Sequence, residues 1–229
     1  CHQEHDEDRQ AIECLKRAVE EDPSNLDALL DLGVSYVNEL DSQNALKTLK
    51  GWIDHHPSFQ GMKYTPDAYS DGTLMDEIMQ LMLQAREFDA TDPDVHIILG
   101  VLYNVSRDFD SAVASLRQAL SLRPDDYSLW NKLGATQANG NRGLEAMPAY
   151  EKALQMKPKY ARAWLNMGIS YANLGNYSKA VRGYLKALKL NPQASHVWSY
   201  LRIAFTCMER FDLLKLVDER NVDLFKDFL

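Results

Sequence analysis

The chain has 229 residues, and its 45% hydrophobic content is enough for a sizeable core, which excludes a disordered chain. Its 25 Lys and Arg against 33 Asp and Glu give a net charge of −8, which argues against a nucleic-acid or anionic-membrane surface but leaves local basic spots open. No apolar run approaches the roughly 20 residues of a membrane span, so we expect a soluble, cytoplasmic protein.

Apolar and small residues recur along the chain with a period of about 34, which is typical of tetratricopeptide repeats. Residues 1–25 resemble the second half of such a repeat, so we expect the chain to be a fragment of a longer protein. Residues 26–59 form a complete unit. Residues 60–92 form an irregular hinge unit, because 60–73 contain Gly and Pro without helical periodicity.

Three regular units follow, at 93–126, 127–160 and 161–194, and 195–229 should hold the last repeat helix and a helical cap. Seven positions agree between the second and third of these units. They are Trp130, Leu133, Gly134, Ala146, Tyr150, Ala153 and Pro158, which recur as Trp164, Met167, Gly168, Ala180, Tyr184, Ala187 and Pro192. Because each unit is a pair of helices that buries its apolar face against neighbours, we expect an all-α superhelix.

Two positions depart from the repeat pattern. Gln137 stands where an aromatic residue is usual, which leaves a polar group to satisfy near a helix interface. Pro148 lies inside the second helix of its unit, where the missing backbone hydrogen bond costs about 3 kcal/mol or kinks the helix. We expect a local kink there.

The sequence contains no phosphate-cradling Gly loop, no HExxH and no nucleophile elbow, so we expect neither an enzyme nor a bound cofactor. Cys1, Cys14 and Cys207 form no CxxC pair and have no His at ligand spacing, which argues against a disulfide framework or a zinc site. His55 and His56 are adjacent, and adjacent side chains on a helix do not face each other. A capping or solvated role is therefore favoured over metal binding.

Asparagine recurs on one face of the first helices of the repeats, at the thirteenth place and about two helical turns earlier. The set is Asn38, Asn131, Asn139, Asn166 and Asn173, with Lys132 and Arg162 on the same face. An amide both donates and accepts, so it can pair with any peptide backbone, and a cation can bind a carboxylate. This face is predicted to bind an extended peptide on the concave side. The alternative is that Asn at helix ends only terminates the helix.

Four stretches are more specific than a generic repeat: LWNKLGATQANGN (129–141), RAWLNMGISYANLG (162–175), DVHIILGVLYNVSRDFD (94–110) and VWSYLRIAFTC (197–207). They closely resemble the tetratricopeptide domain of the peroxisomal targeting signal type 1 receptor family, especially its plant and algal branch. The resemblance implies two repeat triplets joined by the hinge. It also implies an import receptor that cycles to the peroxisomal membrane, binds cargo ending in Ser-Lys-Leu, and meets the docking machinery through a region amino-terminal to this chain.

Carried over residue by residue, the resemblance implies the following peptide-binding residues. The cargo carboxylate and backbone would be held by Asn131, Asn139, Asn166, Asn173 and Arg162, with Lys132 beside them. Asn38 would bind from the other triplet, Glu4 would lie near the cargo Lys, and Ser199 would touch the cargo backbone. The terminal apolar side chain would lie over Ala135 and Ala138.

Two other functions are alternatives for a tetratricopeptide-repeat chain. A carboxylate clamp for acidic EEVD-like tails typically needs Asn at the ninth place of a repeat. The ninth places here are Val34, Val101, Ala135 and Ile169. A scaffold that assembles subunits without reading a chain terminus is the main alternative, and it predicts no dependence on a free carboxylate.

Overall fold

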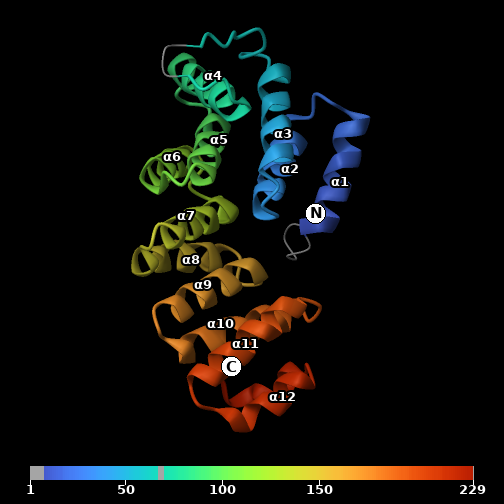
Figure 1. The fold of residues 1–229 in the computed structure, drawn as a ribbon, viewed down its shortest axis with the longest axis vertical. Coiled ribbons are helices and arrows are strands. Elements are labelled where there is room, and N and C mark those ends of the chain that lie inside the picture. The colour runs from blue at the N-terminus through green and yellow to red at the C-terminus, as the bar shows by residue number, and fades with distance from the viewer. Residues whose placement is uncertain (1–7, 67–69, 229) are drawn as a thin grey trace. The chain divides into compact units, whose positions relative to one another are not determined.

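The structure is a computed structural model that describes residues 8–66 and 70–228, and within these ranges every regular element is a helix (Figure 1). The described residues divide into two units, 8–124 and 125–228. The expected all-α fold class is confirmed. No helix among the described residues has the length and apolar content needed to cross a membrane.

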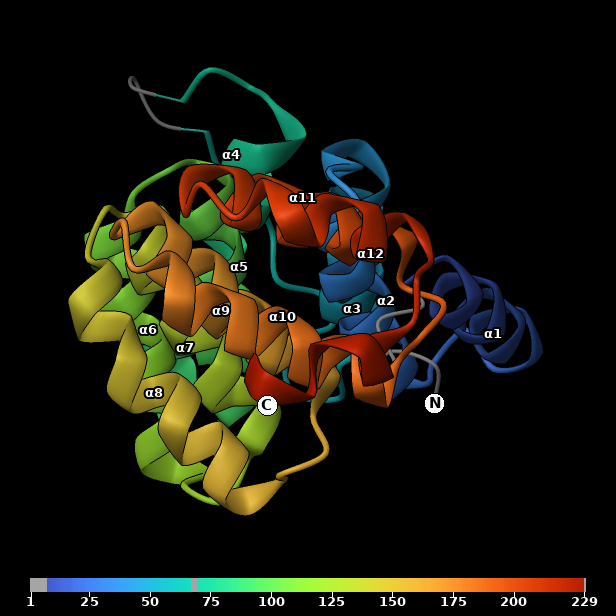
Figure 2. The same cartoon turned by 90° about the horizontal axis from the view of Figure 1, so that it is seen from below.

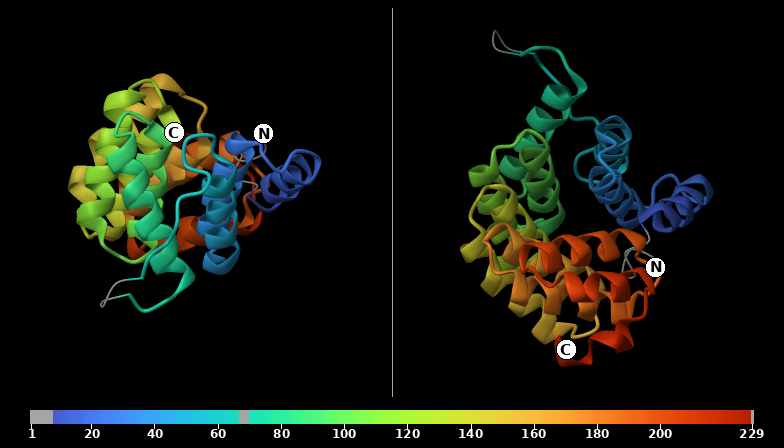
Figure 3. Two further views of the ribbon diagram at one scale, coloured as in Figure 1. Left: turned by 90° about the horizontal axis from the view of Figure 1, so that it is seen from above. Right: turned by 60° about the horizontal axis from the view of Figure 1, so that its bottom comes forward.

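The helices follow one another in pairs. In the first unit they are α1 (Asp8–Glu21), α2 (Leu26–Asn38), α3 (Ser42–His55), α4 (Leu74–Phe88), α5 (Pro93–Val105) and α6 (Phe109–Leu122). In the second they are α7 (Tyr127–Asn139), α8 (Gly143–Met156), α9 (Ala161–Asn173), α10 (Tyr177–Leu190), α11 (Ser195–Cys207), η2 (Phe211–Leu213), α12 (Leu214–Asp218) and η3 (Val222–Phe228). The closest packing joins α2 to α3, α5 to α6, α7 to α8 and α9 to α10 (Figure 3). These pairs are the helical hairpins that the repeat period predicts.

Seven of the α-helices begin after a residue whose side chain accepts a hydrogen bond from the first turn. Such caps are Asn25, Asp41, Thr73, Asp92, Asp108, Asp126 and Asn176. Each cap satisfies a backbone N–H that has no partner inside its helix and is worth about 1 kcal/mol. The short polar residues between the repeat helices therefore fix where each helix starts.

The turn inside each hairpin also repeats. A residue with positive φ recurs 34 positions apart at Arg107, Asn141, Gly175 and Glu209, with φ values of 63°, 61°, 75° and 57°. Only Gly175 adopts this left-handed conformation without the steric cost of a Cβ. The common backbone shows that the hairpin geometry, rather than the residue type, sets this conformation.

Small residues let the two helices of a hairpin approach closely. The ring of Tyr150 on α8 is 1% exposed and lies against Gly134 of α7, where an added Cβ would be 2.7 Å from the ring. Tyr184 of α10 lies against Gly168 of α9 in the same way, with 2.9 Å to an added Cβ. The matched Gly and Tyr positions of the sequence repeat are therefore direct packing partners.

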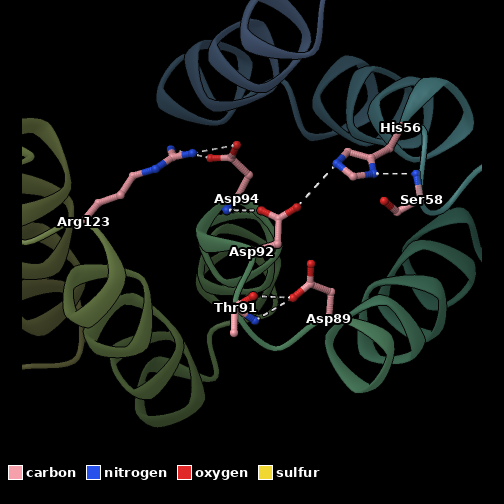
Figure 4. Close-up of polar contacts among 7 residues, drawn as sticks. All are labelled: His56, Ser58, Asp89, Thr91, Asp92, Asp94 and Arg123. Atoms are coloured by element: carbon pink, nitrogen blue, oxygen red, sulfur yellow. Dashed lines mark hydrogen bonds and ion pairs between the residues drawn. The ribbon is translucent and has the colours of Figure 1, made fainter.

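A polar cluster joins α3, α5 and α6 in the first unit (Figure 4). His56 accepts a hydrogen bond at Nδ1 from the backbone N–H of Ser58 at 3.3 Å, and its Nε2 lies 3.4 Å from Asp92 Oδ2. Asp92 also caps α5 by accepting from the N–H of Asp94 at 2.8 Å. Arg123, which follows α6, binds both carboxylate oxygens of Asp94 at 2.6 and 3.0 Å. The start of α5 is thus fixed from two sides.

The adjacent histidines take the capping role expected from the sequence. His55 donates from Nδ1 to the carbonyl oxygen of Gly51 at 2.8 Å, and the residue after it, His56, is the C-cap of α3. Among the described residues, no group of three or more His, Cys, Asp or Glu side chains could hold a metal ion.

Two irregular features of the sequence can be located. In the described part of 60–92, α4 is the helix that forms, and the preceding segment is tied to it because Tyr64 donates to Asp76 at 2.6 Å. In the second unit, α8 continues through Pro148. Pro148 has no N–H to donate to the carbonyl oxygen of Leu144. Because Leu144 is 73% exposed, water can bind this oxygen instead. The helix is not broken there, and the local kink stays a prediction.

Candidate functional site

The predicted peptide-binding residues of the second unit lie on α7, α9 and α11, and α9 contacts both of the other helices. These are the first helices of successive hairpins (Figure 2). Residues 131, 132, 135, 138 and 139 come from α7, residues 162, 166 and 173 from α9, and Ser199 from α11. The repeat therefore places these side chains on neighbouring helices.

An amide pair bridges α7 and α9. Asn131 is buried, with 4% of its surface exposed, and its Oδ1 accepts a hydrogen bond from Nδ2 of the half-buried Asn166 at 3.2 Å. This bond uses the acceptor of Asn131 and one donor of Asn166. The carbonyl oxygen of Asn166 and the amide hydrogens of Asn131 are left to bond another group. One acceptor and one donor are what a peptide backbone requires.

The two cations of the site are half-buried and come from adjacent helices. Lys132 donates from Nζ to the hydroxyl of Ser128 at 3.0 Å, one helical turn earlier. Arg162 is the second residue of α9. The supporting role of Ser128 was missed in the sequence, although its spacing of four residues from Lys132 on a helix was the available signal.

The asparagines at the thirteenth place are the last residues of their helices: Asn38 ends α2, Asn139 ends α7 and Asn173 ends α9. All three are exposed, and their side chains make no hydrogen bond within the described part of the chain. The helix ends are closed instead by the backbone N–H of the following residue. These amides therefore do not cap their helices and are accessible to a ligand. Asn38 belongs to the first unit.

The remaining predicted residues differ in exposure. Ala135 and Ala138 are half-buried on α7, and Ser199 is exposed on α11. Tyr200 and Ile203 are also exposed on α11, at 38% and 58%, and had not been predicted as site residues. Glu4 lies outside the described residues. A surface depression lined by Leu174, Gly175, Asn176, Tyr177, Ser178 and Met208 contains none of the predicted site residues.

Behind the site, Gln137 is a buried polar residue, as the sequence suggested. It is 3% exposed, and its Oε1 has no hydrogen-bond partner among the described residues. The equivalent place in neighbouring repeats holds Tyr103, Tyr171 or Phe205. Gln137 therefore leaves a buried acceptor unsatisfied at a position where the neighbouring repeats have an aromatic ring.

We expect Gln137→Met to stabilise the fold by about 1 kcal/mol, because it removes the unsatisfied oxygen and nearly preserves the volume. Urea unfolding measures the change in the free energy of unfolding. The control is Gln155→Met, which makes the same substitution at an exposed position of α8. Equal effects of the two variants would contradict a cost at the buried oxygen.

Comparison with known proteins agrees with this architecture. Two family models described as tetratricopeptide repeat match the chain, one at 161–193 and the other at 9–58 and 99–161. The structure titled "MamA RS-1 ArsTM double mutant" superposes with a TM-score of 0.57 at 22% identity, covering 64% of this chain and 80% of that one. The structure titled "MamA AMB-1 P212121" gives 0.56 at 24% identity, covering 64% and 89%. At these identities the likeness concerns the fold alone.

Several curated relatives are similar to this chain in sequence. "Peroxisome biogenesis protein 5" of Arabidopsis thaliana is 48% identical over 51% of this chain and 16% of its own length. "Peroxisomal targeting signal 1 receptor" of Dictyostelium discoideum is 39% identical over 65% of this chain and 25% of its own. "PEX5-related protein" of Mus musculus is 38% identical over 62% and 27%. The chain thus spans about a quarter or less of these relatives, and the expected resemblance is confirmed.

Proposed function

Because the chain belongs to the tetratricopeptide-repeat family and is similar to peroxisomal targeting signal receptors, we propose that it is the cargo-binding domain of a peroxisomal import receptor. Its ligand is the carboxyl-terminal tripeptide of cargo proteins, Ser-Lys-Leu or a close variant. In this proposal the peptide lies in a groove along α7, α9 and α11. The receptor acts in the cytoplasm and cycles to the peroxisomal membrane.

The amide pair between Asn131 and Asn166 is the observation that carries the proposal. Asn has a poor helix propensity, so two of them in mid-helix need a reason. Each satisfies one group of the other at 3.2 Å and keeps one group for a ligand. A peptide backbone that crosses α7 and α9 can use both groups whatever its side chains are.

In this proposal the two cations bind the carboxylate at the end of the peptide. A free carboxylate binds Arg through paired N–H groups, and each such charge-assisted bond is worth about 1.5–3 kcal/mol. Arg162 lies one helical turn before Asn166 on α9, and Lys132 follows Asn131 on α7. In this proposal the two cations lie beside amides that bind the peptide backbone. They therefore favour a peptide whose carboxyl terminus lies here over a peptide that continues past this point.

Titration with two fluorescent peptides tests the proposal. Both end in Ser-Lys-Leu, and one carries a carboxyl-terminal amide. We expect the free acid to bind and the amidated peptide to lose most of that affinity, because amidation removes the charge that Arg162 and Lys132 would bind. Equal affinity for both peptides would favour the scaffold function, in which a chain terminus is not read.

Asn173→Ala tests the exposed amides at the helix ends. We expect it to weaken binding of the free-acid peptide by about 1–3 kcal/mol, because a polar group of the bound peptide would lose its partner. Gln155→Ala removes an amide from α8, outside the predicted site, and should leave the affinity unchanged. Unchanged affinity in Asn173→Ala would remove this residue from the site.

A further inference from the structure

Helix α10 carries a stripe of positive charge on one face. Its cations are Lys179, Arg182, Lys186 and Lys189, and its 14 residues include no Asp or Glu. Their spacing of three, four and three residues places them on the same side of the helix. Lys179, Arg182 and Lys189 are exposed, and Lys186 is half-buried. We call these four residues the basic stripe.

The charges of the basic stripe are not balanced by the rest of the described chain. Within the described residues, none of the four forms an ion pair, although other cations of the second unit do pair, as Arg202 does with Asp218 and Arg210 with Asp212. Arg182 and Lys186 are like charges one helical turn apart, which is unfavourable on a helix. Burial, and then the charge of Arg182, lower the pKa of Lys186. The fold therefore bears an electrostatic cost here without a compensating acid.

Aromatic faces hold two of the four cations in place. The ammonium of Lys186 lies 3.9 Å from the ring centre of Trp164, and that of Lys179 lies 5.1 Å from the ring centre of Tyr171. The Trp164 ring is itself fixed, because its indole N–H donates to the carbonyl oxygen of Pro158 at 3.0 Å. The immobilisation of a cation by a ring lowers the entropy cost of binding an anion.

We propose that the basic stripe of α10 is a docking surface for a short acidic polypeptide segment. Lys179 and Lys189 are ten positions apart on the helix, a distance of about 15 Å at 1.5 Å per residue. An extended chain covers that distance with about five residues, at about 3.3 Å each. A segment with four or so carboxylates within five or six residues therefore matches the stripe in length and charge.

The overall charge favours a short segment over a long polyanion. Screening limits electrostatic attraction to about 8–10 Å at physiological salt, so a short acidic peptide senses mainly the local positive field. A nucleic acid or an anionic membrane extends well beyond that distance and would meet the excess negative charge of a chain whose net charge is −8. A peptide is the occupant that fits both the stripe and its surroundings.

The test uses the intact chain and a fluorescein-labelled octapeptide with six Glu residues and an amidated carboxyl terminus. The amide prevents the probe from binding as a chain terminus. We expect saturable binding by anisotropy that weakens about tenfold in Lys179→Gln/Arg182→Gln/Lys189→Gln, which leaves Lys186 on Trp164. The matched control, Lys159→Gln/Lys215→Gln/Lys226→Gln, removes the same charge from exposed positions elsewhere in the second unit and should change affinity less than twofold.

Each of four results would overturn the proposal. The first is no saturable binding of the acidic peptide, and the second is equal weakening in the two triple variants, which would indicate a general charge effect. The third is tighter binding to vesicles containing phosphatidylserine than to the peptide. Affinity for the free-acid Ser-Lys-Leu peptide should stay unchanged in the α10 triple variant, so that failure of this proposal is distinguishable from failure of the proposed cargo function. A parallel tenfold loss for that peptide would also contradict a separate surface.

Discussion

Gly183→Ala is expected to destabilise the second unit by about 2 kcal/mol. Gly183 lies on α10 where it meets α9, and an added Cβ would be 2.9 Å from both the Cα of Gly168 and the carbonyl oxygen of Trp164. Both atoms belong to backbone, which cannot rotate away as a side chain would. Overpacking of this kind costs about 3 kcal/mol, and the better helix propensity of Ala returns about 1 kcal/mol.

The matched control is Gly51→Ala on α3, where the nearest atom to an added Cβ is Leu29 Cδ2 at an ordinary 3.6 Å. Here only the helix propensity acts, so we expect a gain of about 0.5–1 kcal/mol. Urea unfolding of both variants should therefore give changes of opposite sign. A Gly183→Ala protein as stable as the parent would show that α9 and α10 are not in backbone contact at this point.

The role of Gly183 shows where prediction from sequence ends. The 34-residue pattern correctly predicted the helical hairpins, and it included Gly134 and Gly168 because both copies share them. Gly183 falls outside the pattern, since its equivalent in the preceding unit is Ala149. A small residue could be expected at that place, but whether a methyl group fits depends on a backbone separation of a few tenths of an ångström, which residue types do not encode.

The candidate site was predictable as a set of residues but not as a set of bonds. Helical spacing indicated that Asn131 and Asn166 lie on matching faces of neighbouring helices. It could not show that one amide donates to the other at 3.2 Å, because that depends on side-chain rotation. The hydrogen bond from Lys132 to Ser128 was likewise indicated in the sequence only by their spacing of four residues. Asn38 lies in the first unit, so its part in the site stays a prediction.

The basic stripe shows a second limit of prediction from sequence. A net charge of −8 correctly describes the chain as a whole but hides a local excess of the opposite sign. The absence of acids from 177–190 is visible in the sequence. What the sequence could not supply is that the rings beneath Lys179 and Lys186 come from α9, through contacts between two helices.

Alkaline pH is expected to weaken the fold through Tyr150. The ring of this residue is 1% exposed, and burial raises the pKa of its phenol to about 12, although a hydrogen bond from Ser170 acts in the opposite direction. In the unfolded chain the phenol titrates near pH 10. Stability is therefore fully present below pH 10 and is lost as the pH rises through 12, because the unfolded state releases its proton first. We expect a loss of about 2 kcal/mol between pH 9.5 and 11.5.

Tyr150→Phe separates this titration from those of the other tyrosines. The variant keeps the ring that packs against Gly134 and loses the hydroxyl, so the part of the pH dependence due to residue 150 should disappear. Any stability lost with the hydrogen bond from Ser170 is independent of pH and shifts the whole curve without changing its slope. Urea unfolding of both proteins at pH 9.5 and 11.5 measures the difference in slope. Parallel curves would mean that the phenol of Tyr150 ionises as readily in the folded state as in the unfolded one, which is incompatible with its burial between α7 and α8.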